Sequence, residues 1–461
     1  MTMRSHVDPC TFVMFIHIAG DHLSNDLVEK LQDFQPTQGA SPDFVLDHMA
    51  RRSRQVHFHE AYHFWQGLHL PFLYRYAFLS FRQACMAFKS LAAQETNFLK
   101  WDCVLPEFER LGLSEKIGIG SRSHLFWGRE KAVFPAEVID EVELSPLDLL
   151  ECATSIAEFQ VSATGDKVEP AVLSRWAKRN PAYLEPYELA SRFLENPSLA
   201  LRSILPLINA AFHTSEPVRT FVELLGRLWG TFVPDSSFAR TFLTQQEPCR
   251  WPELFEIWLG ELPYEAKPNA DGRILGSPYH RITHEEWVGS AFTTKDGGFI
   301  IHPFLGLLAR KWIEDQKSNP EYGLLIDQPA WVRPETLGRC LTDFSPPLTV
   351  FRFHLGNEHD KIFFTGRANG QGFTSLPLST ESEWRAFVAD TLTIYGAVRR
   401  ASGAHFDAEQ RTCHHSQCPY YNANFCNTYP IIPSDFRSCG FPKRIQELVN
   451  TGSVNHGNAI P

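Results

Sequence analysis

The feature that most constrains the fold of this 461-residue chain is a stretch from Phe44 to Leu91 that contains only one proline and one glycine. Apolar residues recur along it at the three- and four-residue spacing of an amphipathic helix. The single proline, Pro71, removes a backbone hydrogen bond and clashes with the preceding turn wherever a helix tries to continue through it. We therefore expect two consecutive helices that meet near Pro71.

Most of the remaining pattern is also helical. In the segment Ser145–Ala163, Ser145 can cap the helix, Pro146 suits its first turn and Asp148 favours the positive end of the helix dipole. Further helices are expected in series between positions 170 and 262, at 302–316 and at 380–401, and strands are expected at 11–20 and as a hairpin within 348–368. The predicted fold class is mainly α with minor β (α+β), in three regions: 1–165, 166–340 and 341–461.

Composition and charge exclude several functional classes. Hydrophobic residues make up 43% and charged residues 21% of the chain, which is typical of a folded globular protein. The net charge of -10 disfavours nucleic acid and anionic lipid as partners. No apolar run approaches the roughly 18 residues of a membrane span, so no membrane partner is expected. Six cysteines are scattered singly, as in proteins of the reducing cytoplasm, where we expect this one to be located.

The residues most suggestive of chemistry lie within the first predicted helix. His59, Glu60 and His63 form the sequence HEAYH, an instance of HExxH. Residues four apart lie on one helix face, so both imidazoles can bind a single ion. Glu60 lies about 100° round the helix from His59, where its carboxylate can reach a water at the same ion. The motif therefore supplies two metal ligands and a general base.

The sequence around this motif resembles the zincin metallopeptidases. Val56 precedes the first ligand by three positions, Tyr62 is uncharged, Trp65 is hydrophobic and no proline interrupts, as in the longer pattern of that family. The resemblance implies a zinc-dependent hydrolase, specifically a peptidase acting on protein or peptide substrates. It also implies that His59 and His63 bind catalytic zinc and that Glu60 is the general base.

A catalytic zinc needs a third protein ligand. In one zincin group the third ligand is the last histidine of the pattern HExxHxxGxxH. Here His69 fits that ligand position, but Gln66 replaces the glycine. Gluzincins take a glutamate from a later helix, and Glu151 and Glu158 lie seven residues apart on nearly one face of such a helix. Glu151 is our first choice, because the small residues after it allow close packing against the HExxH helix. Glu158 remains an alternative ligand, or a group that holds an imidazole N–H.

A second metal site is predicted near the C-terminus. Four cysteines and two histidines lie in a turn-rich aromatic segment. The cysteines are Cys413, Cys418, Cys426 and Cys439. Four thiolates can bind structural zinc, or alternatively an iron-sulfur cluster. They leave a zinc ion no open position, so this site is not expected to be catalytic.

Two other functional classes compete with the zinc peptidase. The first is a helical binding or regulatory protein whose HExxH helix is structural and whose only metal lies in the cysteine-rich tail. The second is a di-iron carboxylate protein, since Glu60 and His63 form an ExxH unit. That class needs a second ExxH, and no other histidine in the chain has a glutamate three positions before it.

Overall fold

The computed structural model describes residues 5–7, 12, 14–19, 54–73, 130–133, 141–162, 170–177, 181–214, 216–232, 251–262, 303–344, 349–354 and 361–365. Within these residues the chain is mostly helical with little strand, which confirms the prediction of a mainly α protein. No helix in them is both long and apolar enough to cross a membrane. The predicted helix at 380–401 and all four C-terminal cysteines lie outside this part of the chain.

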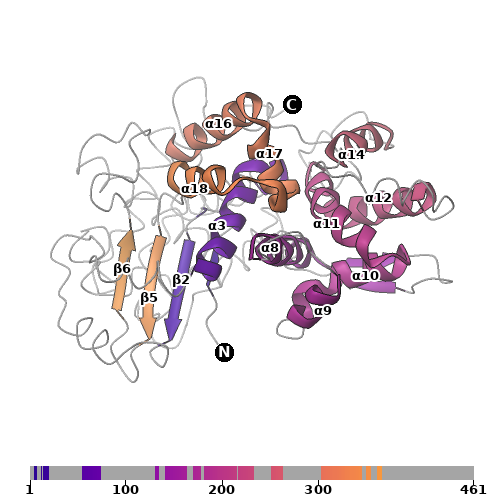
Figure 1. Cartoon of the computed structure of the whole chain (residues 1–461), viewed down its shortest axis with the longest axis horizontal. Helices are drawn as coiled ribbons and strands as arrows, with labels where there is room; N and C mark the ends of the chain where they lie inside the picture. The colour runs from indigo at the N-terminus through magenta and orange to yellow at the C-terminus, as the bar shows by residue number, and fades with distance from the viewer. Residues whose placement is uncertain are drawn as a thin grey trace, which may run out of the picture.

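The larger sheet joins the two ends of the described chain. Its strands are β1 (His6–Val7), β2 (Met14–Ala19), β5 (Thr349–His354) and β6 (Lys361–Thr365), in the order β1-β2-β5-β6. β5 and β6 pair antiparallel, which confirms the predicted hairpin, and β2 confirms the predicted N-terminal strand. β2 pairs with β5 in parallel, with Met14 opposite Thr349 and Ala19 opposite His354 (Figure 1). A second, two-stranded sheet consists of β3 (Glu130–Val133) and β4 (Glu141–Leu144).

The helix that carries the HExxH motif is α3 (Arg54–His69), and it ends two residues before Pro71, as predicted. It lies beside α8 (Pro146–Ser162) in the middle of the molecule (Figure 1). The first turn of α8 has the predicted cap: Ser145 Oγ accepts a hydrogen bond from the backbone N–H of Asp148 at 3.1 Å, and the Asp148 carboxylate accepts one from the N–H of Ser145 at 2.8 Å. This reciprocal arrangement satisfies backbone donors that the helix leaves unpaired.

The other helices form two groups. One group follows α8 in the chain: α9 (Pro170–Ala177), the 3-10 helix η3 (Pro181–Leu184), α10 (Glu185–Phe193), α11 (Pro197–Ala211), α12 (Pro217–Phe232) and α14 (Trp251–Gly260). The other group is α16 (Pro303–Ser318), α17 (Pro320–Asp327), the 3-10 helix η4 (Pro329–Trp331) and α18 (Pro334–Asp343). Both α16 and α17 pack against α3. The series of helices in the middle of the chain and the helix near 302–316 are therefore confirmed.

Aromatic residues of α3 hold this helix in place through their polar atoms. Tyr62 and Trp65 are fully buried. The Tyr62 hydroxyl donates a hydrogen bond to the carbonyl of Ile326 at 2.5 Å, near the end of α17. The Trp65 indole donates to the carbonyl of Phe344 at 2.9 Å, just after α18. Large apolar rings with satisfied polar ends both fill the core and fix the direction in which the helix faces. The two histidines of the motif are thus carried on a well-anchored helix.

Candidate metal centre

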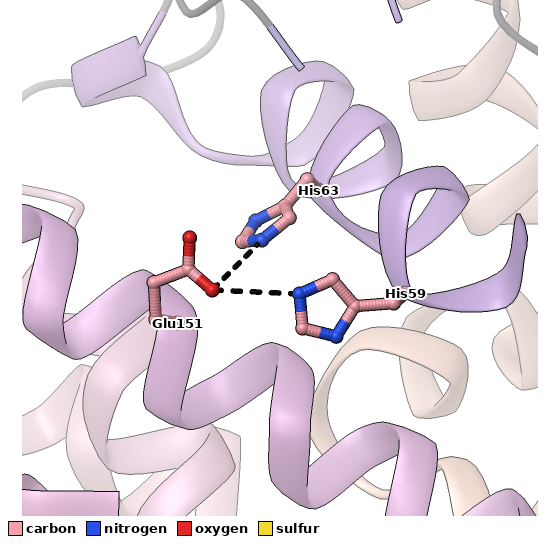
Figure 2. Close-up of side chains that lie close together, drawn as sticks. All are labelled: His59, His63 and Glu151. Carbon is pink, nitrogen blue, oxygen red and sulfur yellow. Dashed lines mark ion pairs between the residues drawn. The ribbon is translucent and has the colours of Figure 1, made fainter. Parts of the chain in front are cut away.

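His59 and His63 lie one turn apart on α3, and Glu151 approaches them from α8. Glu151 Oε2 is 3.4 Å from His59 Nε2 and 3.6 Å from His63 Nε2 (Figure 2). The three side chains each offer one ligand atom, and these atoms all lie within 4.8 Å of one another. In the described part of the chain this is the one group of three or more potential ligands that comes together in this way.

The distances between these atoms can be compared with those around a metal ion. Ligand atoms bound at about 2.0–2.1 Å to a tetrahedral zinc lie roughly 3.3–3.5 Å from one another. The separations of 3.4 and 3.6 Å from Glu151 to the two rings are close to that range. Two neutral imidazoles and one carboxylate are also a donor set that zinc accepts. The donor set and these two separations are therefore compatible with a shared zinc ion.

The outer nitrogen of each imidazole has its own partner. His59 Nδ1 lies 3.2 Å from Glu158 Oε2, on the same helix as Glu151. His63 Nδ1 lies 3.1 Å from the side-chain oxygen of Gln66 and 3.1 Å from the hydroxyl of Thr154. Such contacts fix the orientation of metal-binding histidines and determine which nitrogen carries the proton. In both rings they leave Nε2 on the side of Glu151.

The electrostatics of the group favour a cation. Burial acts to lower the pKa of His59, but the carboxylates of Glu151 and Glu158 outweigh it and raise that pKa to about 10. Burial acts to raise the pKa of Glu151, but His63 and His59 hold it well below its usual range. The proton on the His59 ring therefore balances part of the negative charge of the carboxylates in the metal-free protein. A divalent cation could take over this role, because it supplies positive charge at the point where the ligand atoms meet.

Glu60 is placed differently from the other acidic residues of the site. Its side chain is only 3% exposed, and its Oε2 has no hydrogen-bond partner among the described residues. Burial raises the pKa of Glu60 to about 7, although His63 and His59 act to lower it. A carboxyl group in such surroundings can exchange a proton near neutral pH, which is the property required of a general acid or base.

The site is not closed to solvent. The side chains of His59, His63 and Glu151 are 16%, 12% and 23% exposed. Glu60 lies almost entirely inside the protein. Water can thus reach the three potential ligands, while the candidate base is buried.

The other candidates for a third ligand lie elsewhere. Glu158 contacts the outer nitrogen of His59 and is not in the three-residue group. His69 Nδ1 lies 2.9 Å from the side-chain nitrogen of Gln316, and its ring packs edge-to-face with that of His213, with centroids 6.1 Å apart. Since α3 stays helical up to His69, that residue lies six positions and about 240° round the helix from His63. The ligand arrangement of the HExxHxxGxxH pattern is therefore not formed by these side chains.

Sequence analysis did not identify three residues beside the site. Gln66 appeared only as a departure from a glycine, and Thr154 and Tyr183 were not singled out. The ring of Tyr183, in η3, lies 6.4 Å from that of His59. For Thr154 a signal exists: it is a polar residue on the face of α8 that carries both glutamates. No comparable signal marks Tyr183, because its position depends on the packing of η3 against α8.

Comparisons with protein-family models, with curated proteins and with solved structures found no match to this chain. The interpretation of the site consequently depends on its own residues and geometry.

Proposed function

We propose that the chain is a zinc-dependent hydrolase, most specifically a peptidase that cleaves amide bonds. The observation that carries the proposal is the convergence of His59, His63 and Glu151 on one point, beside a buried carboxylate on the same helix as the histidines. The preference for amide substrates rests on the resemblance of the motif to zincins.

His59, His63 and Glu151 would hold the ion through Nε2, Nε2 and one carboxylate oxygen. When bound in this way, zinc lowers the pKa of water towards about 7 and polarises a carbonyl group. Three protein ligands leave a fourth position open to water and substrate, as catalytic zinc sites require. The partial exposure of the three side chains supports this arrangement.

Glu60 would act as the general base. It would accept a proton from the water that attacks the substrate carbonyl, as the new carbon–oxygen bond forms. It would then donate this proton to the leaving nitrogen as the carbon–nitrogen bond breaks, giving a carboxylic acid and an amine. The raised pKa of about 7 supports the proposal, because both proton transfers must be possible at one pH.

The sharpest test is the substitution Glu60→Gln in the full chain. The zinc-loaded protein is incubated with unfolded casein and with a mixture of internally quenched peptides, and bound zinc is measured in parallel. We expect hydrolysis to fall roughly 10²–10⁴-fold while bound zinc is unchanged, because the amide cannot accept the proton. His63→Ala is expected to lose both activity and one zinc ion.

Glu188→Gln is the matched control, since Glu188 is exposed on α10 and its substitution also removes one negative charge. It should leave activity and zinc content unchanged. Activity retained by Glu60→Gln would refute Glu60 as the base. Failure of the zinc-loaded wild-type protein to hydrolyse any of the peptides would overturn the peptidase assignment.

A non-enzymatic binding or regulatory protein is the second candidate, and the contacts of Glu151 give it specific support. Its ion pairs with His59 and His63 could hold α3 against α8 without any metal. In that case the only metal of the protein would be the structural zinc, or the iron-sulfur cluster, of the C-terminal cysteines. His63→Ala would then reduce stability and leave the zinc content unchanged, which distinguishes this candidate from the enzyme.

The cellular setting is part of the same proposal. The scattered single cysteines favour the reducing cytoplasm. The negative net charge favours protein or peptide substrates over nucleic acid.

A further inference from the structure

The outer nitrogen of His63 faces a buried pair of polar side chains that connects the two ligand-bearing helices. Gln66 lies three residues after His63 on α3, and Thr154 lies three residues after Glu151 on α8. Both Gln66 and Thr154 are fully buried. His63 Nδ1 is 3.1 Å from Gln66 Oε1 and 3.1 Å from Thr154 Oγ1, and those two oxygens are themselves 3.1 Å apart.

Hydrogen-bonding capacity determines which form of His63 suits these surroundings. Gln66 Oε1 can only accept a hydrogen bond. If Nδ1 carried no proton, its lone pair would face this oxygen at 3.1 Å, and the two acceptors would repel each other. With a proton on Nδ1, the ring donates to Gln66 Oε1 and to Thr154 Oγ1. The amide oxygen of Gln66 therefore favours the tautomer with Nδ1–H.

That tautomer leaves the lone pair on Nε2, the nitrogen that lies 3.6 Å from Glu151 Oε2. Neutral imidazole binds a metal through an unprotonated nitrogen, and the proton on the other nitrogen decides which one is free. The reverse orientation of the Gln66 amide would turn an N–H group towards Nδ1 and favour the opposite tautomer. The orientation of one buried amide thus controls whether His63 presents its lone pair to the metal centre.

Thr154 is a second contact of the amide oxygen of Gln66. Its hydroxyl can donate to Gln66 Oε1 or to the carbonyl of Leu150, which lies 2.9 Å away. When the hydroxyl donates to Gln66 Oε1, the amide must present its oxygen, and not its N–H group, on this side. The opposite end of the amide, Gln66 Nε2, has no hydrogen-bond partner among the described residues, and a buried donor without a partner costs stability. A buried group that carries such a cost is a candidate for a functional role.

We propose that Gln66 is a positioning residue that holds His63 in its metal-ready tautomer, and that Thr154 holds the amide of Gln66. The inference rests on the proposed function of the site and extends it to a residue outside the ligand set. It also gives a role to the residue that replaces the glycine of HExxHxxGxxH. Gln66 continues the helix where a glycine would allow the chain to turn. Its side-chain oxygen contacts the outer nitrogen of His63.

The test measures zinc affinity of the full chain by competition with a chromophoric chelator. Gln66→Met keeps the length of the side chain and removes the acceptor, so we expect zinc binding to weaken 10- to 100-fold. Gln66→Glu restores an acceptor and should bind zinc within a few-fold of the wild type. Thr154→Val should weaken binding by a smaller factor. Gln160→Met, on α8, is the matched control and should have no effect.

A second measurement separates positioning from general damage to the fold. Histidine-selective ¹⁵N spectra of the zinc-loaded protein report which nitrogen of His63 carries the proton and which is free to bind the ion. We expect Nδ1–H for His63 in the wild type and in Gln66→Glu, and loss of this preference in Gln66→Met. Wild-type zinc affinity in Gln66→Met, or failure of Gln66→Glu to restore it, would overturn the inference.

The two levels of the proposal can fail separately. If His63→Ala retains all bound zinc, the proposed metal centre itself is wrong. If His63→Ala loses one zinc ion while Gln66→Met binds zinc as the wild type does, only the role of Gln66 is refuted. Should Gln66→Met fail to fold, Thr154→Val and Gln66→Glu still decide between these outcomes.

Discussion

Gly67 provides a test of how tightly the metal-binding helix is packed against the N-terminal segment. It lies on α3, one turn after His63, and is buried. A Cβ atom placed on Gly67 would lie 2.8 Å from Cε1 and 2.9 Å from Cδ1 of Phe12. The Phe12 side chain is 1% exposed and its backbone has a positive φ of 56°, so it has little freedom to move away.

The magnitude follows from two opposing effects. Alanine is favoured over glycine in a helix interior by about 1 kcal/mol. Carbon atoms in contact normally lie about 3.5–4.0 Å apart, so a Cβ on Gly67 would overlap the Phe12 ring by roughly 0.7 Å or more. Overpacking of this kind costs about 1–3 kcal/mol. We therefore expect Gly67→Ala to lower the free energy of unfolding by up to about 2 kcal/mol.

Gly226 on α12 is the matched control, because a Cβ there would meet no atom within 4 Å. Gly226→Ala should raise the free energy of unfolding by up to about 1 kcal/mol. The assay is urea unfolding of both variants, with the slope of the transition compared as well as its midpoint. Stabilisation by Gly67→Ala as large as that by Gly226→Ala would refute the reasoning, since it would mean that Phe12 yields at no cost.

Three further outcomes follow from other contacts. Glu158→Gln should weaken zinc binding by about tenfold, because His59 loses the charged partner of its Nδ1; unchanged affinity in chelator competition would contradict this role. Burial raises the pKa of Asp327 from 3.8 to about 6, although a hydrogen bond from Asn209 acts to lower it. Between these two pH values the folded protein therefore binds a proton that the unfolded chain does not. The stability that this proton contributes is lost as pH rises through about 6. Asp327→Asn should therefore be more stable than the wild type by about 1–3 kcal/mol at pH 7, with the difference vanishing below pH 4 in urea unfolding; an equal difference at both pH values would argue against it. Glu195, which follows the last turn of α10 with a positive φ of 49°, should tolerate Glu195→Gly with a gain of about 0.5–1 kcal/mol, and a lower melting temperature would speak against this.

Local features of the fold could be predicted from the sequence because their causes are local. The end of α3 before Pro71 follows from the geometry of proline, and the start of α8 follows from hydrogen bonds within four residues. The pairing of β2 with β5 could not be predicted in this way. It joins residues more than 300 positions apart, and nothing in either strand's own pattern specifies its partner.

The residues of the candidate site could likewise be predicted only where local geometry places them. HExxH places His59, Glu60 and His63 by helix periodicity alone, and the structure brings His59 and His63 together with Glu151. Sequence reasoning narrowed the third position to Glu151, Glu158 or His69 but had only an indirect argument for choosing among them. Seven residues of helix turn through about 700°, so Glu151 and Glu158 lie within roughly 20° of the same direction. Which of them reaches the inner nitrogens depends on how α8 sits against α3, and this is a property of the whole core.

A single helix, α8, contacts both histidines of the site. Thr154 lies about 60° round α8 from Glu151, so the ligand and the two outer partners that come from α8, Thr154 and Glu158, occupy one narrow face. Thr154 contacts Nδ1 of His63, and Glu158 contacts Nδ1 of His59. Glu151 lies near Nε2 of both rings. A displacement of α8 by one turn would remove all of these contacts together. The geometry of the centre is therefore determined by the packing of two helices, and individual polar contacts only adjust each ring within it.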